Sequence, residues 1–302
     1  MNASRPIPTS VGFAGMGRMG VPMAAQLVDA GFDVTVYNRT AAAAAGFAAT
    51  HSSSSAPTPR ELALAASIIV TMVADGPALL ALFEGDDGLL RGLRPGSIVV
   101  DMGTTGIEHT NLARAHLAER GASLVEAPVS GSVAAATGKT LLVMAGGDDA
   151  ALDTVMPVLD AMAGRIIRVG GPGSGAAMKL AVNAVLFGLN QAIAESLVLA
   201  EHAGIDRATA YEVFASSAIA APVVHYRRAV FEHPGTTPVT FSIDLAAKDL
   251  GLIMQLASEV GTSMPQAGLN LEVMQEAGRS GLGEADMGEV ATLIRRGPSG
   301  LA

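Results

Sequence analysis

The stretch VGFAGMGRMGVPMAAQL, residues 11–27, determines how the N-terminal half of the chain folds. Its apolar start predicts a short buried strand over Val11–Ala14, and its end predicts a helix over Met19–Ala30. Between them lies a GxGxxG turn, in which one glycine permits the tight turn, one lets a pyrophosphate approach the backbone and one lets the helix pack on the strand. An ordinary turn is the alternative, but the position between strand and helix favours a phosphate-binding helix N-terminus. We therefore predict a dinucleotide-binding loop made by Gly15, Met16, Gly17, Arg18, Met19 and Gly20.

Short apolar runs continue to alternate with helical segments as far as residue 170. Several runs are apolar at every position, as in strands that are buried on both faces. This alternation predicts an α/β Rossmann domain over residues 1–170, with a doubly wound, mainly parallel sheet. The further predicted strands are Val34–Tyr37, Ile68–Val73, Ser97–Asp101, Ser123–Glu126, Thr140–Ala145 and Ile166–Val169, and further helices are Glu108–Arg120 and Ala150–Met162.

The pattern changes at GGPGSG, residues 170–175, and nothing after it resembles a strand. Ser174–Ala203 predicts one long interdomain helix that is apolar on all sides and so buried on most of them. We predict an all-α domain over residues 171–302 for substrate binding and oligomerisation. Its other predicted elements are a helix capped by Asp206, helices over Ile243–Val260 and Leu269–Ala277, and a last helix with a capping box of Asp286 and Glu289.

Composition excludes several classes of protein. Hydrophobic residues make up 50% of the 302 and charged residues only 16%, which excludes intrinsic disorder. The lack of cysteine excludes disulfides, zinc–thiolate sites, iron–sulfur clusters and cysteine nucleophiles. A net charge of −9 argues against nucleic acid. The apolar run Leu62–Ala74 is shorter than the roughly 20 residues of a membrane span, the N-terminus lacks a signal-peptide pattern, and the histidines lack metal-ligand spacing. We expect a soluble, cytoplasmic protein without a metal.

The residues that follow the second strand bear on the choice of cofactor. Asn38, Arg39 and Thr40 stand where NAD-binding proteins usually have an acidic residue that binds the ribose hydroxyls. The planar cation of Arg39 suits a phosphate, so we predict a preference for NADP(H). The alternative is that Arg39 is a solvated residue stacking over adenine, with NAD(H) accepted as well.

Two more strand ends point to the same crevice, because open α/β sheets bind ligands at the carboxyl ends of their strands. Val73, Ala74 and Asp75 follow one strand, and Thr104 belongs to the loop that follows another. We predict that these residues line the nicotinamide side of the cofactor. Helix capping is the alternative role for each loop.

Four motifs occur in order along nearly the whole chain: the glycine loop, EAPVSGS at 126–132, GPGSGAAMKLAVN at 171–183 and FSIDLAAKDL at 241–250. In these motifs the chain resembles the β-hydroxyacid dehydrogenases, a family that includes 3-hydroxyisobutyrate dehydrogenase, tartronate semialdehyde reductase and the glyoxylate/succinic semialdehyde reductases. The resemblance covers nearly the whole chain. It implies that Lys179 is the general acid/base, that Asn183 holds the substrate, that Ser130, Gly131 and Ser132 bind its carboxylate, and that Lys248 lies over the cofactor.

The residues themselves fit this chemistry. Lys179 and Asn183 are four apart on the long helix and so share one face. Apolar surroundings would lower the pKa of a lysine and let it exchange protons near neutrality; a lysine that extends to solvent is the alternative. A hydroxyl followed by a glycine can form an anion-binding nest. Asp249 is expected to be structural.

Two positions depart from the family pattern. Ser132 replaces a second glycine, and Gly288 stands where a serine is usual. The serine could narrow the carboxylate pocket and so leaves the identity of the substrate open, and the glycine leaves open how the C-terminal segment closes the site.

We therefore expect an NAD(P)-dependent oxidoreductase that interconverts a small hydroxy acid and its semialdehyde or keto acid, working as a homodimer or homotetramer on a small anionic carboxylate. The alternatives are an imine reductase-like enzyme, which generally lacks the lysine, and a non-catalytic cofactor-binding scaffold.

Overall fold

The computed structural model describes residues 10–296. The chain divides into two compact units, Met1–Lys179 and Leu180–Ala302. The division falls inside the long helix α8 (Ser174–His202), whereas the sequence prediction places the boundary at residue 170.

The first unit contains a nine-stranded sheet in the order β3-β2-β1-β4-β5-β6-β8-β7, with β9 paired to β8. The strands from β3 to β6 are parallel, β8 is antiparallel to β6 and β7, and β9 is parallel to β8. This confirms the predicted doubly wound, mainly parallel sheet. Its strands are β1 (Ser10–Ala14), β2 (Asp33–Tyr37), β3 (Ser54–Ser55), β4 (Ile68–Thr71), β5 (Ile98–Asp101), β6 (Ser123–Glu126), β7 (Val129–Ser130), β8 (Leu141–Gly146) and β9 (Ala163–Gly170). The prediction missed β3 and β7, because two residues are too few to show a periodic pattern.

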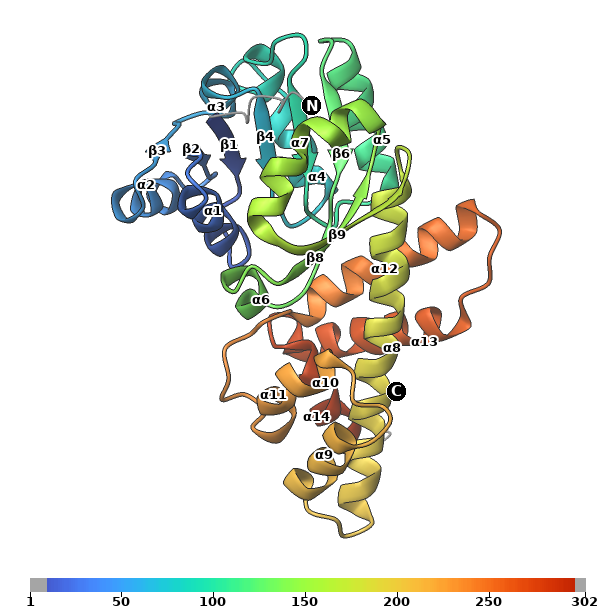
Figure 1. The fold of residues 1–302 in the computed structure, drawn as a ribbon. Coiled ribbons are helices and arrows are strands. Elements are labelled where there is room, and N and C mark those ends of the chain that lie inside the picture. Colours follow the sequence, from blue (N-terminus) through green and yellow to red (C-terminus); the bar gives the residue numbers. More distant parts are fainter. Residues whose placement is uncertain (1–9, 297–302) are drawn as a thin grey trace, which may run out of the picture. The chain divides into compact units, whose positions relative to one another are not determined.

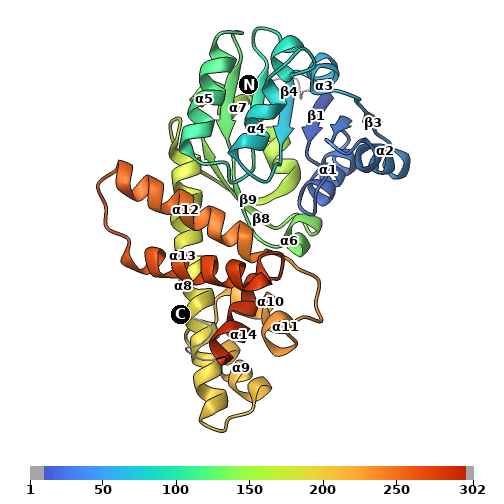
Figure 2. The same cartoon turned by 180° about the vertical axis from the view of Figure 1, so that it is seen from behind.

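Helices cover both faces of this sheet, as Figures 1 and 2 show from opposite sides. Alternate strand residues supply two separate cores: Val11 and Val70 belong to one, and Ile69 and Val99 to the other. Helices α1, α2, α6 and α7 contribute to the first core, and α3, α4 and α5 to the second. Their bounds are α1 (Gly20–Asp29), α2 (Ala41–Thr50), α3 (Pro59–Ala65), α4 (Gly76–Phe83), η1 (Leu89–Arg91), α5 (Ile107–Ala118), α6 (Val133–Thr137) and α7 (Asp149–Met162).

The strand order reverses at β1, which pairs with β2 on one side and with β4 on the other. Open sheets bind ligands outside the carboxyl ends of their strands at such a point. The glycine loop follows β1 directly, and the loops predicted to bind the cofactor follow β2, β4 and β5. Topology therefore collects four separate sequence segments at one edge of the sheet.

The second unit is helical, and its core brings together α8, α9, α12, α13 and α14 around side chains such as Phe187, Tyr211 and Ile253. Residues 180–296 contain no strand, only a single bridge between Ser242 and Asp286. The predicted long helix is confirmed. After α8 come α9 (Arg207–Ser216), α10 (Pro222–Tyr226), α11 (Arg228–Glu232), α12 (Ile243–Glu259), α13 (Pro265–Ala277), η2 (Gly278–Leu282), η3 (Met287–Glu289) and α14 (Val290–Arg295).

Helix α8 is the one element among the described residues that is long and apolar enough to cross a membrane. The mean hydropathy of its most apolar 18-residue window is 1.4, and 44% of that window is buried inside the protein. The sequence pattern points instead to the shorter run Leu62–Ala74 as the best apolar stretch, and that run is divided between α3 and β4. Core helices of soluble proteins satisfy the same test, so α8 is weak evidence for a membrane.

Candidate cofactor and substrate site

The three glycines of the loop have three different environments. Gly15 has a φ of +107°, and a Cβ there would lie 2.3 Å from the carbonyl oxygen of Met72 on the neighbouring strand end. A Cβ on Gly20 would lie 1.8 Å from the carbonyl oxygen of Gly15. A Cβ on Gly17 would meet nothing within 4 Å. Gly15 and Gly20 are thus required by the fold, whereas the space over Gly17 is open, as a loop that lets phosphate reach the backbone requires.

Asn38 holds this loop from the end of β2. Its Oδ1 accepts a hydrogen bond of 3.0 Å from the backbone N–H of Met16, and its Nδ2 donates to the carbonyl oxygen of Thr40 at 3.1 Å. Met16 is buried in the core, and the partly buried Met19 packs against it. Asn38 therefore shapes both loops of the predicted cofactor site.

The charged side chains near this loop face solvent. Arg18 and Arg39 are exposed, and so is Thr40. An exposed guanidinium can be reached by a phosphate from solvent, and its planar fork of donors matches the phosphate oxygens.

Asp75, in the loop after β4, has a structural role as the cap of α4. Its carboxylate accepts a 2.8 Å hydrogen bond from the backbone N–H of Ala78 and caps α4. Capping was the alternative role for this loop. Val73 is partly buried and Ala74 is exposed, so both can border a ligand at the strand end.

A buried carboxylate, that of Asp101, organises the loop after β5. Its Oδ1 accepts from the hydroxyl of Thr71 at 2.8 Å, and its Oδ2 accepts from the hydroxyl of Thr105 at 2.6 Å. Burial raises the pKa of Asp101, although these two hydroxyls and the Gly103 N–H lower it in part. Thr104 lies between Gly103 and Thr105, which both bond Asp101, and it is half-buried. Asp101 therefore fixes the turn that places Thr104 at the edge of the sheet.

The predicted carboxylate-binding segment lies where β7 meets α6. Ser130 ends β7 and is partly exposed. Gly131 has a φ of +146°, and a Cβ there would lie 2.8 Å from Leu141 and 2.9 Å from Ala135. Ser132 caps α6, since its Oγ accepts from the N–H of Ala135 at 3.3 Å.

Lys179 and Asn183 lie one turn apart on α8. Lys179 is partly buried, and Asn183 is only 3% exposed. Nδ2 of Asn183 donates a 2.7 Å hydrogen bond to Oδ2 of Asp249 on α12, and Oδ1 of Asp249 is 2.7 Å from Nζ of Lys248. Asp249 thus connects two residues of the predicted site, Asn183 and Lys248. The sequence predicts a structural role for Asp249, and its adjacency to Lys248 is the only sequence signal of this contact.

The segment just before α12, at Thr240 and Phe241, is held by Asp286, which lies near the C-terminus. The carboxylate of Asp286 accepts from the backbone N–H groups of Thr240 and Phe241 at 2.9 and 3.3 Å, and it forms a buried ion pair with Arg227. Phe241 packs against Phe187 with ring centroids 5.9 Å apart.

The capping box predicted at Asp286 and Glu289 is wrong. The carboxylate of Glu289 bonds Gly235 and Thr292 instead of reaching back to Asp286. Asp286 itself caps only the short η3, through the N–H of Gly288 at 3.0 Å.

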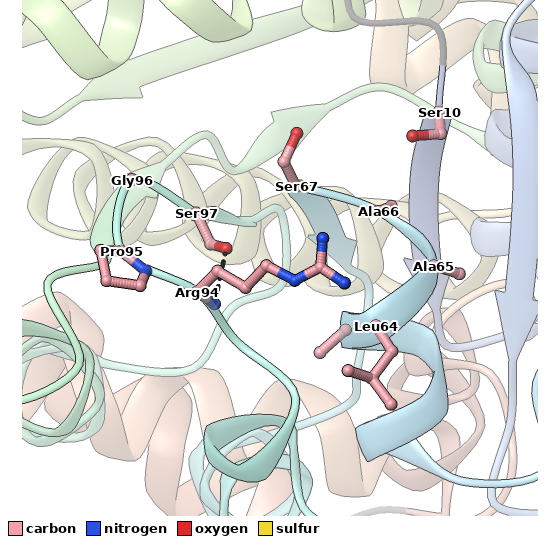
Figure 3. Close-up of a pocket in the computed structure, with 10 residues that line it drawn as sticks. Ser10, Leu64, Ala65, Ala66, Ser67, Arg94, Pro95, Gly96 and Ser97 are labelled. Carbon is pink, nitrogen blue, oxygen red and sulfur yellow. Dashed lines mark hydrogen bonds between the residues drawn. The ribbon is translucent and has the colours of Figure 1, made fainter.

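A separate pocket of about 310 Å³ opens at the amino ends of β1, β4 and β5 (Figure 3). Arg94 extends across it, with its backbone N–H bonded to Oγ of Ser97, and Ser10 and Ser67 border it (Figure 3). This is the sheet edge opposite the glycine loop, so the pocket is no part of the predicted cofactor site.

Within residues 10–296, no group of three or more His, Asp or Glu residues could hold a metal ion.

Known proteins match the chain over nearly its full length. The NAD binding domain of 6-phosphogluconate dehydrogenase matches residues 10–171, and the NAD-binding domain of NADP-dependent 3-hydroxyisobutyrate dehydrogenase matches residues 173–294. Glyoxylate/succinic semialdehyde reductase 2 of Arabidopsis thaliana is 32% identical over 298 residues, which cover 96% of this chain and 80% of that protein. The chain belongs to the β-hydroxyacid dehydrogenase family.

Solved structures agree. The 3-hydroxyisobutyrate dehydrogenase of Mycobacterium tuberculosis, solved with L-serine, has a TM-score of 0.82 at 30% identity and covers 95% of this chain and 99% of its own. Psf3 in complex with NADP+ and 2-OPP has a TM-score of 0.86 at 25% identity, covering 94% of this chain and 99% of its own. The fold predicted from sequence is confirmed, and this β-hydroxyacid dehydrogenase is an NAD(P)-dependent oxidoreductase.

The structure gives a local reason for both departures of this β-hydroxyacid dehydrogenase from its family pattern. Ser132 caps α6 with a side-chain hydrogen bond that a glycine lacks. A Cβ on Gly288 would lie 2.7 Å from Val230 and 3.4 Å from the guanidinium of Arg227. A serine at position 288 would therefore force the side chain of Val230 to shift.

Proposed function

We propose that this β-hydroxyacid dehydrogenase is an NADPH-preferring reductase that interconverts a small hydroxy acid and its semialdehyde or keto acid, with Lys179 as general acid/base. The observation that carries the proposal is the fixed Asn183 one turn from Lys179. The Asp249 carboxylate accepts from Nδ2 of Asn183, and Oδ1 of the same amide is an acceptor that could bind a substrate hydroxyl.

The residues of the glycine loop fit a dinucleotide. The open space over Gly17 and the N-terminus of α1 can receive the pyrophosphate, while Asn38 keeps the loop in this shape. The exposed Arg39 would bind a 2′-phosphate, which supports NADPH over NADH. When bound, the nicotinamide supplies or accepts the hydride.

Residues of the chain then transfer the proton and bind the carboxylate of the substrate. In reduction, Nζ of Lys179 gives a proton to the oxygen of the carbonyl; in oxidation, it removes that proton from the hydroxyl. The hydroxyl of Ser130 and the backbone N–H groups next to Gly131 would hold the substrate carboxylate, because a hydroxyl beside successive main-chain donors can form an anion-binding nest.

Lys179→Ala tests this assignment. We expect kcat to fall by about 10²–10⁴, the usual contribution of a positioned proton donor, with the Kd of NADPH nearly unchanged. Lys139→Asn is the matched control, because Lys139 is exposed and its φ of 55° is one that asparagine tolerates. Normal turnover by the Lys179 variant would refute the mechanism.

A substrate panel followed by NADPH absorbance tests the chemical class. Reduction of glyoxylate and succinic semialdehyde with NADPH supports the proposal. Oxidation restricted to 3-hydroxyisobutyrate with NAD would contradict the cofactor assignment, and turnover of cyclic imines alone would favour an imine reductase.

We also propose that the protein is a cytoplasmic homodimer or homotetramer. Val185 and Leu199 are 74% and 71% exposed, and with the exposed Ala192 they recur every seven residues along α8. A second copy would cover this apolar face. Light scattering at micromolar concentration that shows only monomer would contradict the oligomer, and recovery with the membrane fraction would contradict the location.

A further inference from the structure

A buried carboxylate, Glu126, holds the start of the helix that carries Lys179. Glu126 is the last residue of β6 and is 1% exposed. Its Oε1 accepts a hydrogen bond of 3.0 Å from the N–H of Gly173, and its Oε2 accepts one of 3.2 Å from the N–H of Ala176. Helix α8 therefore takes its N-terminal acceptor from a strand 47 residues earlier in the chain.

The charges around this carboxylate explain why it can remain there. Arg114 on α5 forms an ion pair with Oε1 of Glu126, and the side chain of Arg114 is 25% exposed. The other guanidinium branch of Arg114 donates to Oδ1 of Asn111 at 2.6 Å, which holds the cation in place. The positive end of the α8 dipole adds to the attraction.

Two glycines bring the helix directly onto the strand ends. A Cβ on Gly175 would lie 2.8 Å from both Cβ and the carbonyl oxygen of Glu126. A Cβ on Gly146, at the end of β8, would lie 2.5 Å from the backbone nitrogen of Gly175. The first turn of α8 therefore has one packing position against the sheet, and Gly175, the last glycine of the GPGSG segment, is needed for that contact together with Gly146.

We propose that Glu126 is a positioning residue for the reaction: it sets the height and rotation of the first turn of α8, and through it the place of Lys179. Gly175 and Ala176 precede Lys179 by four and three residues, so they form the helical turn directly beneath it. The same strand end leads to Ser130 four residues later, so Glu126 fixes the lysine relative to the carboxylate-binding segment. This inference rests on the proposed role of Lys179.

Glu126→Gln is the main test, because it keeps the shape of the side chain but turns one acceptor into a donor facing a helix N–H. The readout is the single-turnover rate of NADPH oxidation by succinic semialdehyde, per NADPH-binding site. We expect this rate to fall at least tenfold while the Kd of NADPH stays within twofold. Hydrogen exchange of the amides at 173–177 should become faster.

Glu201→Gln is the matched control at the opposite end of the same helix. Glu201 pairs with Arg207 and Arg295, so the variant also removes a paired carboxylate from α8. We expect lower stability and an unchanged single-turnover rate. If Glu126→Gln does not fold, Glu126→Asp replaces it, since the shorter side chain keeps the charge but cannot reach both amides.

The inference is overturned if the rate stays within twofold of the wild type, whether or not the amides at 173–177 exchange faster. It is also overturned if Glu201→Gln slows turnover equally. Lys179→Ala, measured in parallel, separates the two proposals: an active lysine variant refutes the proposed function, whereas an inactive one beside a fully active Glu126→Gln refutes only the positioning role.

Discussion

Asn183 donates a 2.7 Å hydrogen bond to the buried carboxylate of Asp249, which lies 66 residues further along the chain. The contact joins α8 to α12 and fixes which side of the Asn183 amide carries its oxygen. Asp249 also contacts Nζ of Lys248 at 2.7 Å, so its charge is compensated within the same helix.

Asp249→Asn should therefore impair the use of substrate more than the binding of cofactor. The new amide can turn its NH₂ group toward Asn183, which then has no acceptor for its own N–H. We expect the KM for the carbonyl substrate to rise by about tenfold, equivalent to about 1.4 kcal/mol, with the Kd of NADPH within threefold. In the double variant with Asn183→Ala, the two effects should not add; fully additive effects would show that the hydrogen bond does not orient Asn183.

Substitutions in the glycine loop should separate folding from cofactor binding. Gly17→Ala meets open space, so we expect the free energy of unfolding to change by less than about 0.5 kcal/mol and the Kd of NADPH to rise at least tenfold. Gly15→Ala and Gly20→Ala should destabilise the protein, because their Cβ atoms meet backbone oxygens. Thermal unfolding and fluorescence titration measure the two effects. Gly46→Ala, also in open space but on α2, is the control that should leave NADPH binding unchanged.

Arg39→Asp should reverse the cofactor preference. An acidic residue would repel the 2′-phosphate of NADPH and accept hydrogen bonds from the ribose hydroxyls of NADH. We expect the ratio of kcat/KM for NADPH over NADH to fall at least tenfold. Arg120→Asp makes the same change of charge at an exposed position after α5 and should leave the ratio unchanged. A smaller fall in the Arg39 variant would mean that Arg39 does not select the phosphate.

The buried pair of Arg227 and Asp286 should make stability depend on pH. Burial by itself would raise the pKa of Asp286, but Arg227 and the N–H groups of Gly288 and Thr240 lower it below the usual 3.8. The stabilisation is therefore present above pH 3.8 and is lost as the pH falls through the lower pKa of the folded state.

Asp286→Asn tests this dependence, because it leaves Arg227 buried without its anion. We expect a loss of about 3–5 kcal/mol in the free energy of unfolding at pH 7, measured by urea denaturation. The difference from the wild type should shrink steadily below pH 3.8. Asp86→Asn, at a carboxylate whose side chain is 98% exposed, should show neither effect. A difference independent of pH would contradict the role of the ion pair.

The sequence alone determined the features that depend on neighbouring residues. Three features follow from local periodicity and backbone conformation. They are the glycine loop between Val11–Ala14 and the first helix, the change to an all-helical chain after residue 170, and the placement of Lys179 and Asn183 on one helical face. These features can be recognised because a turn, a strand or a helix restricts the residues within a few positions of one another.

Only the tertiary structure decided which distant groups meet. The partner of Asp249 is 66 residues away, that of Glu126 is 47 residues away, and Asp286 bonds the backbone of a segment 46 residues earlier instead of forming the expected capping box with Glu289. A buried carboxylate must find donors, but its own sequence neighbourhood does not say which ones, because packing of sheet ends and helices selects them. The motifs therefore predict the site residues, whereas only the folded structure shows which distant residues contact and position them.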